Sequence, residues 1–468
     1  MNETTPQPAT SLPGYITSAT PNPMDKRAPW YKNTAPTYAG IFLWFVFWDP
    51  VTNGGQSLSA GLGVALLGLL LSALACHYLF YLVPGLFGMR TGLPLYIVGT
   101  STFGAQGGFI MPGFLMGVLQ FGWLGVNAFF SSMLLYNTFS GGSLTADSTY
   151  PVPGHAILVV IWAALAAFMG LKGIQYVAKV ATYLPLLPLI ILLILFVKTV
   201  GGVGSFDPQV LVKAGKVAQP LSAGAVIALM LTYVVGFFAT AGAAGVDFGL
   251  NNRDKKDVQM GGLVGIGLAI LVTAGLSLLI VAGAYGQAGA NSPEGVTATS
   301  LMVSVVGEKA AKVFWLLLAL AAFPPACFSS FIAANSFKTT LPKVNPFVSV
   351  GIGTVVSIVL AMFGWAGKLV AVFTIIGASF GPICGAMVAD YLLSGGRWTG
   401  PRAGFNPAGW LAWALGFVVG ILPNLNVAVP AAPVLAFVVG FVVYFVASKI
   451  GLQSPVVPLS GPLAEATK

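Results

Sequence analysis

Residues 48–55 read WDPVTNGG and lie inside an apolar segment, near residues 37–57, that is long enough to cross a membrane. Pro50 removes a backbone donor and its ring collides with the preceding helical turn, so we expect this helix to be broken near its middle. Residues 237–245 read FFATAGAAG, and their small side chains and glycines mark a second expected break in another apolar segment.

The composition is that of a membrane protein. The chain is 57% hydrophobic and 7% charged, with a mean hydropathy of +0.89. Apolar runs of spanning length recur along its 468 residues, which predicts an all-α polytopic membrane protein. The net charge is +9, but the basic residues do not cluster as they would in a phosphate-binding patch, so no nucleic-acid partner is expected. No nucleotide-binding loop or His/Cys cluster of metal spacing occurs, and no enzyme activity is expected.

Hydropathy predicts about 12 transmembrane helices, near residues 37–57, 59–83, 109–136, 154–171, 180–198, 220–243, 259–285, 310–334, 345–364, 368–393, 408–424 and 430–448. The expected breaks fall in spans one and six, which begin two consecutive groups of five. Such breaks are typical of inverted-repeat transporters, which bind substrate between the broken helices. We therefore expect one transmembrane domain, 34–450, with repeats at about 34–200 and 217–395 and extra helices at about 406–450.

The two ends of the chain are predicted to be cytoplasmic tails, residues 1–33 and 451–468, and the Pro-rich first tail is predicted to be disordered. If both termini are cytoplasmic, only six of the 21 lysines and arginines lie on the outer side of the membrane. Because basic residues favour the cytoplasmic side, this distribution supports the orientation. These six are Lys198, Lys213, Lys216, Lys309, Lys312 and Lys368. We expect a multi-pass monomer in a bacterial or archaeal inner membrane.

Span three contains an unusual polar face. Residues 117–129, GVLQFGWLGVNAF, place Gln120, Trp123 and Asn127 among apolar residues at spacings that stack them on one side of a helix. Because unpaired amides are costly in hydrocarbon, this face must meet protein or a cavity. One interpretation is a site for a flat polar ring, with the indole stacked on its face and the amides bonded to its edge. The alternative is polar contact between helices.

Several short motifs follow one another in a specific order. They are Arg90-Thr91-Gly92, Thr102-Phe103-Gly104, Gln120-Phe121-Gly122-Trp123, Asp247-Phe248, Leu341-Pro342-Lys343, Gly381-Pro382 and Ala389-Asp390-Tyr391. In these motifs the chain, from about Thr34 to span twelve, resembles the nucleobase–cation symporters, which include purine/cytosine permeases and hydantoin transporters. The resemblance implies a LeuT-like fold of two inverted five-helix repeats plus two C-terminal helices, with substrate between aromatic residues of spans three and six.

The resemblance also implies roles for single residues. Trp123 takes the span-three aromatic position, and Phe238, nine residues before Asp247, takes the span-six position. Gln120 matches the amide of the cytosine permeases, and Asn127 matches the amide of the hydantoin branch. The candidate substrate-binding residues are Gln120, Trp123, Asn127, Phe238, Phe47 and Ser329.

The ion site in span eight departs from the family pattern. Sodium-coupled members have two adjacent hydroxyl residues there, and a gap-free alignment from Pro342 puts Phe323 and Pro324 at those positions. Neither side chain can ligate sodium. In this register Ser329 replaces the substrate-facing Asn of the family, whereas a gapped register recovers Ser329 and Ser330 as the hydroxyl pair.

Asp49 is the other candidate for ion coupling. It falls at or beside the span-one residue whose carbonyl faces the ion in sodium-coupled members. Its plainer role would be to cap the broken helix. An ionisable group inside a membrane is a functional hypothesis, and two options follow: Asp49 ligates Na⁺ through its carboxylate, or it carries a proton. No other metal or cofactor is expected.

These features predict a secondary-active symporter that imports a planar nucleobase-like compound, such as cytosine or a purine, by cation-coupled alternating access. One alternative is an amino-acid or other small-solute symporter of the same fold, because free donors at the helix breaks could meet a carboxylate. The second is a non-transporting membrane receptor or a channel. A channel would need a continuous polar stripe, whereas these polar groups cluster at one depth.

Overall fold

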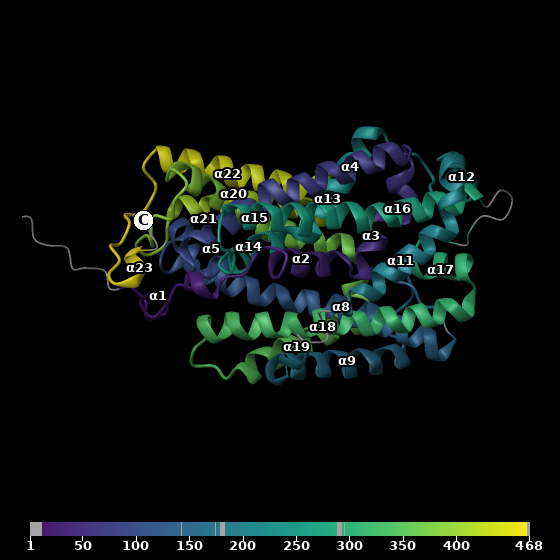
Figure 1. The fold of residues 1–468 in the computed structure, drawn as a ribbon, viewed down its shortest axis with the longest axis horizontal. Helices are drawn as coiled ribbons and strands as arrows, with labels where there is room; N and C mark the ends of the chain where they lie inside the picture. The colour runs from purple at the N-terminus through teal and green to yellow at the C-terminus, as the bar shows by residue number, and fades with distance from the viewer. Residues whose placement is uncertain are drawn as a thin grey trace, which may run out of the picture.

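The computed structural model describes residues 12–465 except 142, 174, 178–182, 288–292 and 294. Within these residues the structure is helical, and pairing between extended segments is limited to two isolated bridges. The long helices run roughly side by side along the longest dimension of the molecule (Figure 1). The prediction of an all-α polytopic protein is confirmed.

Ten helical stretches of the described residues are long and apolar enough to cross a membrane. They are α4–α5 (Leu62–Thr91), α8 with its preceding turn (Phe109–Ser140), α9 (Pro153–Lys172), α11 with its extension (Leu186–Ser205), α13 (Ala223–Ala243), α15–α16 (Lys255–Gln287), α18 (Glu308–Thr340), α20 (Leu369–Leu393), α21 with its extension (Pro407–Leu425) and α22 (Ala432–Lys449). The shorter α19 (Pro346–Met362) matches predicted span nine. Predicted span one is divided between α2 (Thr34–Phe42) and α3 (Trp48–Thr52).

Short helices lie at the two ends of the bundle. Figure 1 shows α1 (Gly14–Thr17) and α23 (Pro462–Glu465) at one end, and α12 (Gln209–Lys213) and α17 (Ala298–Val306) at the other. The first and last described helices therefore share one end, as an even number of spans requires. The assignment of this end to the cytoplasm stays a prediction.

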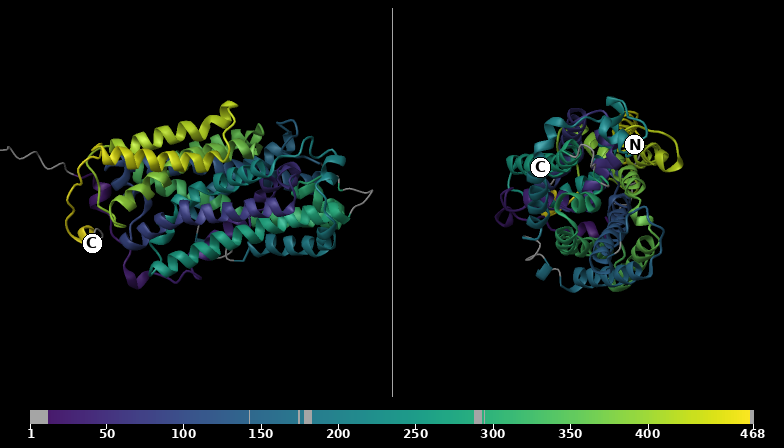
Figure 2. Two further views of the ribbon diagram at one scale, coloured as in Figure 1. Left: turned by 90° about the horizontal axis from the view of Figure 1, so that it is seen from above. Right: turned by 90° about the vertical axis from the view of Figure 1, so that its right-hand side faces the viewer.

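The long helices form two packed groups. Helices α8, α9, α18 and α19 pack together on one side, while α4, α13, α20, α21 and α22 pack on the other (Figures 1 and 2). Glycines permit the closest approaches in the second group. A Cβ atom on Gly385 of α20 would lie 2.1 Å from the carbonyl oxygen of Phe437 on α22. In lipid, where hydrophobic burial does not favour helix association, such close backbone packing is a main source of stability.

Span one is broken twice, and neither break is at Pro50. The first break is at Trp44, whose backbone is extended (φ −67°, ψ 123°). The second follows α3, where Asn53, Gly54 and Gly55 have positive φ. Pro50 itself lies in the first turn of α3, where an N–H group has no helical acceptor, so proline is tolerated there. The interruption expected inside span one exists, but Pro50 is not the residue that causes it.

Span six has no break in its middle. Helix α13 is continuous to Ala243, and Ala244 then joins it to the short α14 (Gly245–Gly249). The interruption therefore lies at the end of the predicted stretch 237–245, and the small residues of this stretch also serve packing. A Cβ atom on Gly242 would lie 2.7 Å from Cβ of Phe80, so the glycine lets α13 approach span two closely.

Residues 12–33 are ordered against the body of the protein, in contrast to the predicted disordered tail; residues 1–11 lie outside the described part. The backbone N–H of Asn22 donates to the carbonyl of Gly92 (2.8 Å), and its side-chain amide donates to the carbonyl of Leu250 (3.0 Å). The N–H of Ala28 donates to the carbonyl of Asn251 (2.8 Å). The segment thus connects the loop after span two with the loop after span six.

Candidate functional site

The ring of Trp123 is surrounded by aromatic side chains from three other spans. Its centroid lies 6.0 Å from that of Trp44, 5.3 Å from that of Phe237 and 5.7 Å from that of Phe373. We name these four residues the aromatic cluster. They come from the break in span one, α8, α13 and α20, so the cluster joins both packed groups of helices.

Close helix approach positions two members of the aromatic cluster. A Cβ atom on Gly236 would lie 2.8 Å from the carbonyl oxygen of Phe373, so the glycine brings α13 against α20. Phe237 and Phe373 consequently meet edge to face, with centroids 5.4 Å apart and planes inclined by 79°. This is a favoured arrangement for aromatic pairs.

Two indole N–H groups in the aromatic cluster differ in their bonding. Nε1 of Trp123 donates to the hydroxyl oxygen of Thr240 on α13 (3.2 Å). Nε1 of Trp44 is buried and has no hydrogen-bond partner among the described residues. Because a buried donor without an acceptor is costly, Trp44 is the group in this cluster that a polar ligand would satisfy.

Phe237, rather than the predicted Phe238, lies against Trp123. Phe238 faces away from the aromatic cluster, where it stacks on Phe42 (5.7 Å, 21°) and contacts Tyr38 (5.7 Å). Successive residues on a helix point in directions about 100° apart, so a one-residue difference in register moves the ring to another face. The choice of Phe238 is corrected to Phe237 as the ring adjacent to Trp123.

Phe47 and Gln120 lie beside the aromatic cluster. Phe47 contacts Phe237, with centroids 4.7 Å apart. Gln120 is 6% exposed, one helical turn before Trp123. Within the described residues its side chain makes one hydrogen bond, from Nε2 to Sδ of Met116 (3.6 Å), and a thioether is a weak acceptor. The carboxamide therefore keeps most of its hydrogen-bonding capacity for another partner.

Asn127 is used in contacts between helices. Its Nδ2 donates to the carbonyl of Ala322 on α18 (2.9 Å), and its Oδ1 accepts from Nε1 of Trp162 on α9 (3.0 Å) and from Oγ of Ser131 (3.3 Å). These bonds connect α8, α9 and α18 beside the prolines of α18. In this structure Asn127 therefore makes polar contacts between helices, which was the alternative interpretation of this polar face.

Asp49 caps a helix far away in the sequence. Its Oδ1 accepts a hydrogen bond from the N–H of Ala298 (2.8 Å), the first residue of α17. The neighbouring indole of Trp48 donates to the carbonyl of Val296 (3.1 Å). The broken part of span one is therefore tied to the segment that precedes span eight. Oδ2 of Asp49 makes no hydrogen bond within the described part of the chain.

Within the described residues no hydrogen bond links the span-eight candidates to Asp49. Ser330 is buried, and its Oγ donates to the carbonyl of Ala326 (3.5 Å) on its own helix while it packs against Gly170 of α9. Ser329 is partly buried on the same turn. Phe323 packs against the ring of Trp162 (5.1 Å). No group of three or more His, Cys, Asp or Glu residues that could hold a metal occurs among the described residues.

Sequence reasoning missed Trp44, Phe237, Phe373 and Thr240. A signal existed for Trp44, which belongs to the aromatic-rich run FLWFVFW at residues 42–48. No signal in the sequence distinguished Phe237 from Phe238, or placed Phe373 of span ten beside span three. Trp44 and Phe47 also line a void of about 20 Å³ on the side of α11 and α16, away from the other three rings of the cluster. This arrangement is suited to non-covalent binding of an aromatic ring, because it offers ring faces and amide or indole donors.

The sequence matches a known family over most of its length. Residues 22–447 match the family described as permeases for cytosine and purines, uracil, thiamine and allantoin. The cytosine permease of Escherichia coli strain K12 is 26% identical over 395 residues, which cover 81% of this chain and 84% of the permease. The cytosine permease of Escherichia coli O157:H7 matches to the same extent.

Solved transporter structures share the fold. The inward-facing conformation of Mhp1 superposes with a TM-score of 0.62 at 17% identity, covering 95% of this chain and 96% of that one. Mhp1 in a closed conformation with bromovinylhydantoin gives 0.61 at 16% identity and 98% coverage of both chains. A substrate-bound Na⁺-coupled sialic acid symporter gives 0.56 at 12% identity, with 92% of both chains covered. The expected LeuT-like fold is confirmed.

Proposed function

Because the chain belongs to the nucleobase–cation symporter family of membrane permeases, we propose that it imports a planar nucleobase-like heterocycle by cation-coupled alternating access. Membership of this family makes the protein a multi-pass transporter and not an enzyme. The proposal places it in an inner membrane with both termini in the cytoplasm. Cytosine, a purine or a related heterocycle is the proposed substrate.

The aromatic cluster carries this proposal. Stacking of a base on an aromatic side chain contributes about 1–3 kcal/mol, and rings from four spans meet at Trp123. A substrate ring would enter between Trp123 and Phe237, so these two side chains have to separate on binding. The amide of Gln120 and the free indole N–H of Trp44 would then bond polar atoms on the edge of the substrate.

The helices that contribute to the cluster also support the proposed mechanism. Trp44 lies at the break of span one, and a substrate bound there would contact the helix most easily rearranged. Asp49 lies after this break and holds the first turn of α17. We propose Asp49 as the group that responds to the coupling cation, either by ligating Na⁺ with its carboxylate or by accepting a proton.

A thermal-shift panel on the purified protein tests the proposed substrate class. Purines, pyrimidines, hydantoins and amino acids are each added with and without sodium, because a ligand that binds only the folded state raises its stability by mass action. We expect a shift with a planar heterocycle and a larger one when the coupling cation is present. A shift with amino acids alone would favour the amino-acid symporter. Binding without accumulation in proteoliposomes under any ion gradient would favour a receptor.

A further inference from the structure

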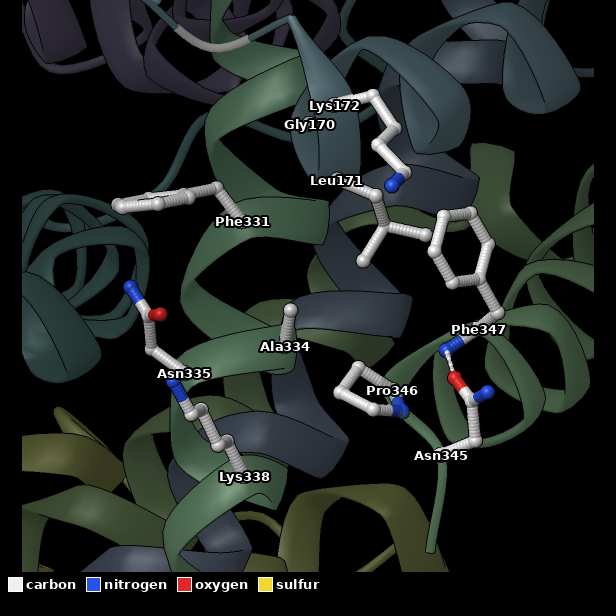
Figure 3. Close-up of a pocket in the computed structure, with 10 residues that line it drawn as sticks. All are labelled: Gly170, Leu171, Lys172, Phe331, Ala334, Asn335, Lys338, Asn345, Pro346 and Phe347. Carbon is white, nitrogen blue, oxygen red and sulfur yellow. Dashed lines mark hydrogen bonds between the residues drawn. The ribbon is translucent and has the colours of Figure 1, made fainter.

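A cavity of about 330 Å³ lies at the end of the bundle that carries the chain termini, away from the aromatic cluster. It is formed by the C-terminal ends of α9 and α18 and by the start of α19 (Figure 3). Its polar lining consists of Lys172, Lys338, Asn335 and Asn345, and the rings of Phe331 and Phe347 belong to its apolar part. None of the lining residues is acidic.

The two lysines approach this cavity from different helices. Lys172 ends α9 and Lys338 lies in the last turn of α18, and Figure 3 shows them on opposite sides of the opening. Nζ of Lys172 lies over the ring of Phe347, 5.2 Å from its centroid, which holds the ammonium group at the cavity. Neither lysine forms an ion pair within the described residues. The cavity therefore carries positive charge that the protein itself leaves unpaired.

The cavity is continuous with a lipid-facing surface. On α9, one stripe of side chains that are at least half exposed leads towards Lys172, and a matching stripe leads along α19 from the cavity. The stripes consist of Ile157, Ile161, Leu165 and Phe168 on α9, and of Val348, Ile352 and Val355 on α19. The two helices pack side by side. In a membrane these apolar stripes would contact acyl chains, and the lysines would lie at the depth of the headgroups.

We propose that this cavity binds an anionic phospholipid such as phosphatidylglycerol, with its headgroup in the cavity that Lys172 and Lys338 line from opposite sides and its acyl chains along α9 and α19. The amides of Asn335 and Asn345 belong to residues that line the cavity and can donate to headgroup oxygens. Basic cavities between spanning helices at the membrane surface are suited to such headgroups. The site is separate from the proposed transport site, so neither proposal depends on the other.

The test compares the purified protein in nanodiscs of phosphatidylcholine alone and with added phosphatidylglycerol, using native mass spectrometry to count retained lipid. The Lys172→Gln/Lys338→Gln variant should lose preferential retention of phosphatidylglycerol, by about fivefold for each lysine. Lys449→Gln is the matched control. Lys449 also ends a spanning helix and lies over an aromatic ring, Phe445, at 5.7 Å, but it does not line this cavity.

Each outcome decides the proposal. Loss of phosphatidylglycerol retention in the double variant, with the control unchanged and both eluting as folded protein from a sizing column, supports it. Equal retention in the double variant and the wild type overturns it, and so does an equal loss in Lys449→Gln. Inorganic phosphate added to phosphatidylcholine nanodiscs forms a separate arm. If the wild type retains inorganic phosphate as strongly as it retains phosphatidylglycerol, the site binds free anions and the lipid proposal is wrong.

Discussion

Trp123 on α8 lies edge-on against Phe237 on α13, with ring centroids 5.3 Å apart and planes inclined by 78°. The two helices belong to different packed groups of the bundle, so this contact spans the interface at which the groups meet. Rings in contact across such an interface can be separated by a flat ligand without breaking a backbone hydrogen bond. The pair is therefore both the proposed substrate site and a contact between the two groups.

The first prediction concerns the stacking pair. Trp123→Ala and Phe237→Ala should each weaken ligand binding by about 1–3 kcal/mol, roughly tenfold to a hundredfold, because each removes one stacking face. Binding is measured by titration of the best ligand from the thermal-shift panel. Phe238→Ala is the matched control, since this ring packs on Phe42 and should affect stability more than affinity. A folded Trp123→Ala protein with unchanged affinity would refute stacking.

The second prediction concerns the indole N–H of Trp44. Trp44→Phe keeps an aromatic ring and removes the indole N–H, which has no partner in the described protein, together with part of the ring volume. The relief of an unpaired donor offsets some of the lost packing, so folding stability should change little. Affinity should fall for heterocycles that carry a carbonyl oxygen on the ring edge and stay constant for analogues that lack it, because a site built to bond a polar edge discriminates by that bond. Competition assays with pairs of ligands that differ only in this oxygen measure the two affinities. Equal affinity loss for both kinds of ligand would show that only ring shape matters.

The third prediction separates the two amides of span three. Asn127→Ala leaves the carbonyl of Ala322 and the indole of Trp162 without their partner, so it should lower stability by about 1–2 kcal/mol. Gln120→Ala removes only a weak contact with Met116 and should leave stability nearly unchanged while it narrows the preference among ligands. Melting temperatures and competition assays on both variants give the comparison. A reversed pattern would assign the ligand contact to Asn127.

The distinction between the two amides marks the limit of prediction from this sequence. Composition and hydropathy predicted the helical class and the spans, because membrane helices must satisfy their backbone within each segment. Helix periodicity correctly placed Gln120, Trp123 and Asn127 in the protein interior, but it could not assign them partners. The partners of these three side chains depend on which helices pack together. Trp162, which bonds Asn127, and Phe373, which contacts Trp123, are both remote from span three in the sequence.

Span two extends beyond its predicted bound. Hydropathy predicted a span near residues 59–83, whereas α5 (Leu82–Thr91) continues through Pro84 to Thr91. The preceding residues Cys76–Tyr81 form a π-helical turn, which changes the backbone bonding just before the proline and lets the helix continue. Sequence patterns do not reveal such a turn. The boundaries of the two repeats, about 34–200 and 217–395, stay a prediction.

The fourth prediction concerns Asp247, which follows span six in α14. Burial raises the pKa of its carboxyl group to about 6 from an ordinary 3.8, although the N–H of Leu95, which donates to Oδ1 (2.9 Å), acts in the opposite direction. Between about pH 4 and pH 6 the folded protein therefore binds more protons than the unfolded chain. Stability should fall as the pH rises through this window.

Asp247→Asn keeps an acceptor for Leu95 and removes the titration, so the difference in melting temperature between wild type and variant should change across this window and level off above it. Asp207→Asn serves as the control, because Asp207 is exposed and, within the described residues, its side chain bonds only the N–H of Gln209. The measurement is a series of melting curves from pH 4 to pH 8. A constant difference for Asp247→Asn would mean that its carboxyl group titrates alike in both states.

The last prediction concerns Asp49 and the coupling ion. Asp49→Asn retains an oxygen that can accept from the N–H of Ala298, so α17 should stay capped and thermal stability should be kept. Asp49→Ala should lose the cap of α17 and lower the thermal stability.

Asp49→Asn also removes the negative charge of the side chain. If the carboxylate ligates Na⁺, the variant should lose sodium-stimulated binding. If it carries a proton, the variant should lose pH-driven accumulation but retain exchange of substrate for substrate. Uptake into proteoliposomes with sodium and pH gradients applied separately distinguishes these outcomes, and full accumulation by Asp49→Asn under either gradient would leave Asp49 as the cap of α17 alone.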